Sequence, residues 1–212
     1  MIKAIVFDLD ETLLDRRKSL QAFLYYQFSK LIEPYNNVKY EVYEKRFLEL
    51  DNNGYIWKYI VYKQLIEELE IKNASIRILL DDYVNNFNKF IIPMENSYEI
   101  LMFLRNKNIK LGIITNGKTS LQKMNIDALN LTDFFDVILI SEEVGYKKPQ
   151  PEIFLKSLKM LDVESHETLF IGDHVENDIK GAKNAGIMAL LFDAKRENIN
   201  FENRIENLME II

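Results

Sequence analysis

The stretch of sequence that decides the fold is Ile2–Thr12, IKAIVFDLDET, at the start of the chain. Its first part, Ile2–Phe7 (IKAIVF), is a short apolar run rich in β-branched side chains, which is typical of a strand buried on both faces of a sheet. The run stops at Asp8, and the two carboxylates of Asp8 and Asp10 cannot continue a buried strand. The sequence therefore predicts a short inner strand with two acidic residues at its carboxyl end.

Beyond Pro93, apolar runs alternate with segments of helical spacing. The expected strands are Leu111–Thr115, Val137–Ser141, Leu169–Gly172 and Met188–Phe192. The expected helices cover about Tyr98–Asn106, Leu121–Leu129, Pro151–Leu161 and Asn177–Ala185. This alternation predicts an α/β fold with a doubly wound parallel sheet of Rossmann-like type, to which the first strand also belongs.

The segment between the first strand and Pro93 has a different character. Its apolar residues follow helical faces, such as Leu20, Phe23 and Leu24, and Asn52–Gly54 is a clear break between two helices. We therefore expect a bundle of about four helices, inserted into the α/β domain after its first strand. The predicted domains are an α/β core of residues 1–15 and 93–212 and an all-helical domain of residues 16–92.

The composition limits the classes of function. The chain has 212 residues, of which 48% are hydrophobic, no cysteine and a formal net charge of −6. The lack of cysteine excludes disulfides, thiol catalysis and thiolate zinc sites, and the acidic balance argues against a nucleic acid polymer as partner. The apolar start meets Asp8 too soon for a signal peptide, and no apolar stretch approaches the roughly 18 residues of a membrane span. We expect a cytoplasmic protein with no membrane partner.

Polar residues follow most of the predicted strands. They are Asp8 and Asp10, Thr115-Asn116-Gly117, Lys147-Lys148-Pro149, and Asp173 with Asp178. In an open parallel sheet, ligands bind outside the carboxyl ends of the strands, so these residues should converge. Crowded carboxylates need a cation, and their hard oxygens suit Mg²⁺, whereas a hydroxyl, backbone amides and an ammonium group suit an anion. A divalent cation beside an anion pocket indicates phosphoryl chemistry.

The same residues resemble the motifs of a known family. Asp8-Leu9-Asp10-Glu11-Thr12 resembles the DxDxT signature of the haloacid dehalogenase-like (HAD) hydrolases. Thr115-Asn116-Gly117 is similar to their second motif, Lys148-Pro149 to the third, and Gly172-Asp173 with Asp178 to the fourth. The four motifs occur in order, each near the end of a predicted strand. The helical insert between the first two resembles the family's cap, which closes over the active site.

The resemblance implies roles for the catalytic and substrate-binding residues. Asp8 would be the nucleophile and form an aspartyl-phosphate. Asp10 would act first as the general acid for the leaving group and then as the base for water. Thr115, the backbone amide of Asn116 and Lys148 would hold the transferring phosphoryl group.

The resemblance also implies a Mg²⁺ site. One oxygen of Asp8, the backbone carbonyl of Asp10 and a carboxylate oxygen of Asp173 would bind the ion, while Asp178 would support the metal or Lys148 from behind. Lys147, next to the motif lysine, is expected to be solvated. His174 is expected to be an exposed loop histidine, because Asp10 already fills the acid–base role.

These roles favour a Mg²⁺-dependent phosphatase, a phosphoric monoester hydrolase, acting on a small phosphorylated metabolite such as a nucleotide monophosphate or a sugar phosphate. Asp10 argues against dehalogenation, because a halide leaving group needs no proton. Two alternatives remain: a sugar-phosphate mutase of the same family, and a switch or binding protein that is phosphorylated on aspartate without turnover. The sequence indicates neither the substrate nor the oligomeric state.

Overall fold

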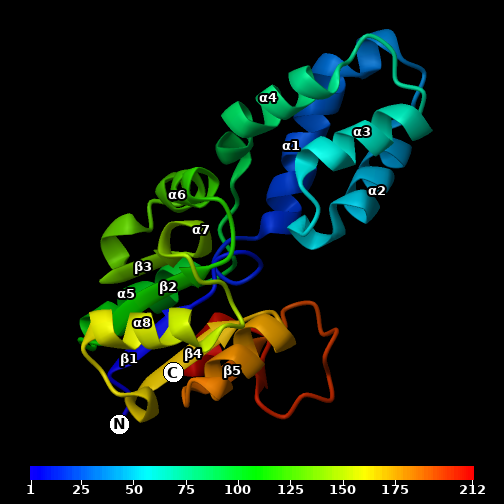
Figure 1. Cartoon of the computed structure of the whole chain (residues 1–212). Helices are drawn as coiled ribbons and strands as arrows, with labels where there is room; N and C mark the ends of the chain where they lie inside the picture. The colour runs from blue at the N-terminus through cyan, green and yellow to red at the C-terminus, as the bar shows by residue number, and fades with distance from the viewer. The chain divides into compact units, whose positions relative to one another are not determined.

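The computed structural model describes all residues, 1–212, and the chain divides into two compact units (Figure 1). The sheet unit comprises Met1–Asp15 and Ile92–Ile212, and the helical unit comprises Arg16–Ile91. Ile92 is the last residue of the predicted helical domain, residues 16–92. It lies in the sheet unit, where its carbonyl accepts a hydrogen bond of 3.0 Å from the backbone N–H of Asp15.

A six-stranded parallel sheet forms the centre of the sheet unit, in the order β3-β2-β1-β4-β5-β6. The strands are β1 (Ala4–Phe7), β2 (Lys110–Thr115), β3 (Val137–Ile140), β4 (Thr168–Gly172), β5 (Met188–Phe192) and β6 (Arg204–Ile205). The predicted α/β fold and its parallel sheet are confirmed. β6 was not expected, because two paired residues leave no hydrophobic run to detect.

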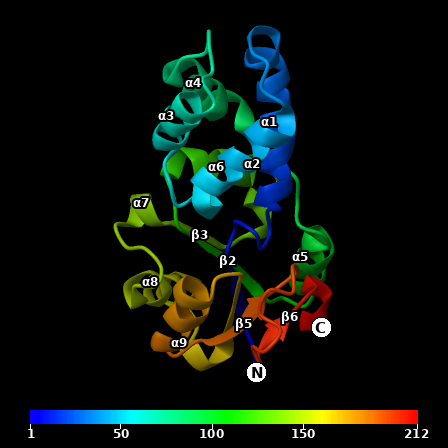
Figure 2. The same ribbon diagram turned by 90° about the vertical axis from the view of Figure 1, so that its right-hand side faces the viewer.

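Helices cover both faces of this sheet, and Figure 2 shows α5 and α8 on opposite sides of it. The helices of the unit are α5 (Ser97–Asn106), α6 (Thr119–Ala128), α7 (Ser141–Val144), α8 (Pro151–Leu161) and α9 (Gly181–Asn184). Ser141 begins α7 instead of ending a strand. The expected helix over Asn177–Ala185 is a π-helical turn, Val175–Lys180, that continues into α9.

The strand register brings the functional ends of the strands together. β1 is fully buried between β2 and β4, with Phe7 level with Ile113 on one side and Ile171 on the other. The residues that follow these three strands therefore leave the sheet at the same edge, as the parallel arrangement requires.

The helical unit contains α1 (Arg16–Leu31), α2 (Tyr40–Asp51), α3 (Lys58–Glu68) and α4 (Ile76–Asn86). Its core is aromatic, with Phe23, Phe47 and Tyr62 completely buried. Gln27 is buried among them, and its amide oxygen accepts a hydrogen bond of 2.8 Å from the Tyr62 hydroxyl, so this polar group has a partner. The predicted insert of about four helices is present.

The predicted break between α2 and α3 is also present. Asn52, Asn53 and Gly54 all have positive φ, at 44°, 53° and 89°. Asparagine and glycine tolerate this left-handed region better than other residues, which explains why the helix ends here. None of the helices combines the length and the hydropathy that crossing a bilayer requires.

Candidate active site

Asp8 lies directly after β1, and its backbone N–H continues the sheet by donating to the Ile171 carbonyl at 2.8 Å. Its side chain is nearly inaccessible, with a relative exposure of 6%. Burial raises the pKa of Asp8 to about 7; the ammonium group of Lys148 opposes this shift, and the carboxylates of Asp178 and Asp10 add to it. The strand thus presents a buried carboxylate at the edge of the sheet where ligands bind.

Lys148 is the cation of this site. Its Nζ lies 2.5 Å from Asp8 Oδ1 and 2.6 Å from Asp178 Oδ1. Burial alone would lower the pKa of Lys148, but Asp178 and Asp8 together outweigh burial and raise it, so the side chain stays charged. Lys147 is exposed, which is the environment that the sequence suggested for it.

Asn116 holds the Lys148 loop in place. Its side-chain Nδ2 donates to the Lys148 carbonyl at 3.0 Å, and its Oδ1 accepts from the Lys148 N–H at 2.9 Å. The peptide bond between Lys148 and Pro149 is cis. The sequence predicted a role for the backbone amide of Asn116 alone, whereas its side chain also links the end of β2 to the loop before α8.

Three carboxylates form the densest acidic group in the unit. One oxygen each from Asp8, Asp173 and Asp178 lies within 4.8 Å of the others. Burial, followed by the charges of Asp8 and Asp178, raises the pKa of Asp173 to about 9. Anionic carboxylates are therefore unfavourable here without a cation, and a group of hard oxygen donors fits Mg²⁺. The Asp10 carboxylate is not part of this group.

Asp178 contacts Lys148, one of the two partners that the sequence suggested for it. It is 1% exposed, pairs with Lys148, and accepts a hydrogen bond of 3.0 Å from the backbone N–H of His174. Gly172 makes room for it, because a Cβ at that position would collide with the Asp178 carboxylate. The glycine of the fourth motif is thus explained by packing.

His174 is not the exposed loop residue that the sequence suggested. It is half-buried, and its Nδ1 accepts hydrogen bonds from the backbone N–H groups of Glu176 and Asn177 at 3.2 and 3.1 Å. The side chain therefore caps the π-helical turn, a role usually taken by Ser, Thr, Asp or Asn. With Nδ1 occupied as an acceptor, His174 supports the loop that carries Asp173.

Gln122 is a site residue that sequence reasoning missed. It lies on α6, is 5% exposed, and its Nε2 donates to Asp10 Oδ2 at 2.7 Å and to Thr115 Oγ1 at 2.6 Å. The signal in the sequence was a polar pair, Gln122 and Asn125, on the same helical face as the buried Ile126. Buried polar side chains on an inward face need partners, and here the partners are two predicted site residues.

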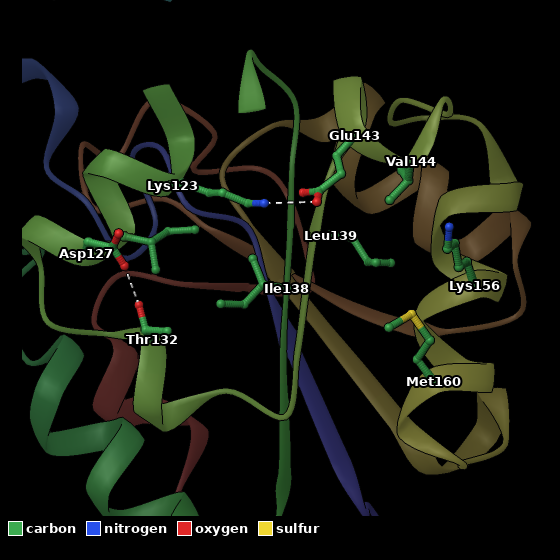
Figure 3. A pocket seen from close by; sticks show the side chains of 10 residues that line it. Lys123, Asp127, Thr132, Ile138, Leu139, Glu143, Val144, Lys156 and Met160 are labelled. Atoms are coloured by element: carbon green, nitrogen blue, oxygen red, sulfur yellow. Dashed lines mark hydrogen bonds and ion pairs between the residues drawn. The ribbon is translucent and has the colours of Figure 1, made fainter. Parts of the chain in front are cut away.

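A cavity of about 420 Å³ lies elsewhere, beside the edge strand β3 (Figure 3). Ile138 and Leu139 line it, and the charged Lys123 and Glu143 above them pair with each other at 2.9 Å. None of the predicted site residues lines this cavity. The acids, the lysine and the hydroxyl that the sequence predicted lie instead at the strand ends.

Comparison with known proteins agrees with this geometry. The family described as haloacid dehalogenase-like hydrolase matches residues 5–192. The chain is 32% identical over 197 residues to glyceraldehyde 3-phosphate phosphatase of Pyrococcus abyssi, covering 91% of this chain and 82% of the relative. It is 31% identical over 194 residues to pyrimidine 5'-nucleotidase YjjG of Escherichia coli, covering 90% and 85%.

Solved structures of the same family share the fold. The HAD-hydrolase YfnB of Bacillus subtilis, solved with magnesium, superimposes with a TM-score of 0.80 at 22% identity over 99% of this chain and 96% of that one. A HAD phosphatase of Thermococcus onnurineus gives a TM-score of 0.68 at 27% identity, with coverage of 99% and 96%. The chain therefore belongs to the haloacid dehalogenase-like hydrolases.

Proposed function

We propose that this protein is a Mg²⁺-dependent phosphatase that hydrolyses a small phosphorylated metabolite through an aspartyl-phosphate at Asp8. The observation that carries the proposal is the buried pair of Asp8 and Lys148, with Asp173 and Asp178 within reach of the same point. An oxygen nucleophile beside a buried ammonium group suits attack on a phosphoryl group, whose negative charge the lysine offsets.

The proposed reaction has two steps. A carboxylate oxygen of Asp8 attacks phosphorus, the bond to the ester oxygen breaks, and Asp10 gives its proton to the departing alcohol. Asp10 then takes a proton from water, whose oxygen attacks phosphorus and releases inorganic phosphate and the free Asp8 carboxylate. Thr115 and Lys148 would hold the phosphoryl oxygens in both steps.

The carboxylates of Asp8 and Asp173 and the backbone carbonyl of Asp10 would hold Mg²⁺, with Asp178 behind them. When bound, the ion would supply positive charge that neutralises the phosphoryl oxygens during transfer. The acidic group supports this assignment, because burial and mutual repulsion leave its carboxylates in need of a cation.

A small substrate is proposed because the relatives are named as phosphatases of glyceraldehyde 3-phosphate and of pyrimidine 5'-nucleotides, which are both small metabolites. A cytoplasmic location stays a prediction from the sequence.

The test is phosphate release from a panel of triose, sugar, glycolate and nucleoside monophosphates, with Mg²⁺ and with chelator. We expect turnover of one class, and only with the metal. An aspartyl-phosphate that persists on the protein without phosphate release would instead identify the non-hydrolytic switch. Conversion of one sugar phosphate into its isomer would identify the mutase.

The raised pKa values predict how metal binding depends on pH. Burial raises the pKa of Asp8 to about 7 and that of Asp173 to about 9, from the usual value of 3.8. The metal-free folded state therefore holds these protons more tightly than the unfolded state does. The stability that this difference contributes is fully present below pH 3.8 and is lost as the pH rises through about 7 and about 9.

Mg²⁺ should therefore stabilise the protein most at alkaline pH, where it need not displace protons. At about 100 times its Kd, a ligand contributes about 2.7 kcal/mol, and at roughly 2–4 °C per kcal/mol this raises the melting temperature by about 5–10 °C. We expect this shift at pH 9 and less than a quarter of it at pH 5, measured by calorimetry. Asp173→Asn should remove most of the shift, and equal shifts at both pH values would contradict the assignment.

A further inference from the structure

Gln122 connects two groups that the proposed reaction uses, the carboxyl group of Asp10 and the hydroxyl of Thr115. Its Nε2 donates to Asp10 Oδ2 at 2.7 Å and to Thr115 Oγ1 at 2.6 Å, while its contact with the Asn116 carbonyl is longer, at 3.4 Å. A side-chain amide nitrogen carries two hydrogens, and the two short contacts use both of them. Gln122 is buried, so solvent does not compete for these bonds.

A second residue fixes the direction in which this amide points. Asn125, one helical turn further along α6, is 6% exposed, and its Nδ2 donates to Gln122 Oε1 at 3.1 Å. With its oxygen engaged there, Gln122 must present its nitrogen to Asp10 and Thr115. A reversed amide would place its carbonyl oxygen against the Asp10 carboxylate and lose all three bonds.

These bonds determine where the hydrogens of the reacting groups can lie. Thr115 Oγ1 accepts from Gln122, so its hydroxyl hydrogen is left to be donated to another acceptor. Asp10 Oδ2 also accepts from Gln122, and since the carbonyl oxygen of a carboxyl group is its better acceptor, this bond favours Oδ1 as the oxygen that exchanges a proton.

We propose that Gln122 is a positioning residue that holds the Asp10 carboxyl group by Oδ2, so that Oδ1 faces the reacting oxygen, and that directs the Thr115 hydroxyl hydrogen to the phosphoryl group. This inference rests on the proposed phosphatase function. It explains why a buried helix face carries two amides. Gln122 orients Asp10 and Thr115, which the proposed reaction uses, and Asn125 orients Gln122.

The test compares two kinds of substrate whose leaving groups differ in whether they must be protonated as they depart. Alkyl phosphates need Asp10 to protonate the departing oxygen, whereas p-nitrophenyl phosphate releases a stable anion that does not. Gln122→Met keeps the length of the side chain and removes its donors. General acid catalysis contributes about 10²–10⁴-fold, so we expect kcat/KM to fall about 100-fold for alkyl phosphates and less than about 10-fold for p-nitrophenyl phosphate.

Two further variants separate positioning from packing. Asn125→Leu keeps Gln122 but releases its amide, and should show the same dependence on the leaving group with a smaller loss. Lys123→Met, next to Gln122 on the outer side of α6, should leave both rates unchanged, because Lys123 pairs with Glu143 at the surface. A loss for Gln122→Met that is the same for every leaving group would overturn the proposal while leaving the phosphatase assignment intact.

A readout without turnover keeps the inference independent of the activity. In ¹⁵N–¹H spectra of the full chain, the side-chain NH₂ signals of Gln122 should exchange slowly and shift when Asp10 is replaced by asparagine. If the unaltered protein hydrolyses no ester, the proposed function fails. These signals then still show whether the Gln122 amide holds Asp10. Gln122 signals that exchange rapidly, and whose chemical shifts do not change in Asp10→Asn, would show that the amide does not hold Asp10.

Discussion

Asp8→Asn should lower phosphate release by about 10⁴-fold or more, which is the scale on which enzymes lose turnover when a nucleophile is removed. An amide oxygen is a poor nucleophile towards phosphorus, so the variant lacks the nucleophile that the first step of the reaction requires. The measurement is phosphate release from the best substrate of the panel with saturating Mg²⁺. In parallel, acid-quenched wild-type protein should carry one phosphoryl group on the peptide that contains Asp8, and the variant should carry none.

The variant should stay folded, which makes the result interpretable. Burial raises the pKa of Asp8 to about 7, so replacing this carboxylate by a neutral amide removes a charge that the fold accommodates poorly. The asparagine oxygen can still accept a hydrogen bond from Lys148. Asp136→Asn is a matched control, because Asp136 pairs with Arg105 at 2.9 Å just before β3, at the opposite edge of the sheet. Turnover of Asp8→Asn within tenfold of wild type would exclude Asp8 as the nucleophile.

The sequence predicted the sheet well because its strands are buried on both faces. β1 reads as an uninterrupted apolar run that stops at an aspartate, and the same contrast marks the end of β4 at Asp173. An abrupt change from apolar to charged residues is enough to predict where such a strand ends. β6 escaped detection because its pairing depends on the neighbouring β5 and not on its own composition.

The residues that meet at the strand ends could be predicted from their positions along the chain, and the contacts that follow from packing could not. Gln122 lies on the inward face of α6, and the helical spacing that indicates this face does not show which side chains its amide contacts. The capping role of His174 depends on a π-helical turn, and the hydrophobic periodicity of the sequence does not predict such a turn. Three-dimensional contacts alone distinguish a buried amide that orients catalytic groups from a solvated one.

Lys148→Met should destabilise the protein more than any other single change at the site. Lys148 lies between Asp8 and Asp178, both buried, and removing the cation leaves two carboxylates facing each other. Breaking a buried ion pair in this way costs about 3–5 kcal/mol, which urea unfolding at pH 8 without metal would detect. Loss of the charge that faces the phosphoryl group should also lower kcat by about 10²–10³-fold.

Two comparisons separate the electrostatic cause from simple loss of packing. The loss of stability should shrink at pH 5, since a raised pKa lets Asp8 take up a proton and removes one of the opposed charges. The double variant Lys148→Met with Asp178→Asn should recover most of the stability and none of the turnover, because the repulsion is relieved while the phosphoryl group still lacks its cation. A loss of stability independent of pH and unrelieved by Asp178→Asn would mean that Lys148 acts through its aliphatic chain, and the balance of charge proposed for this site would be wrong.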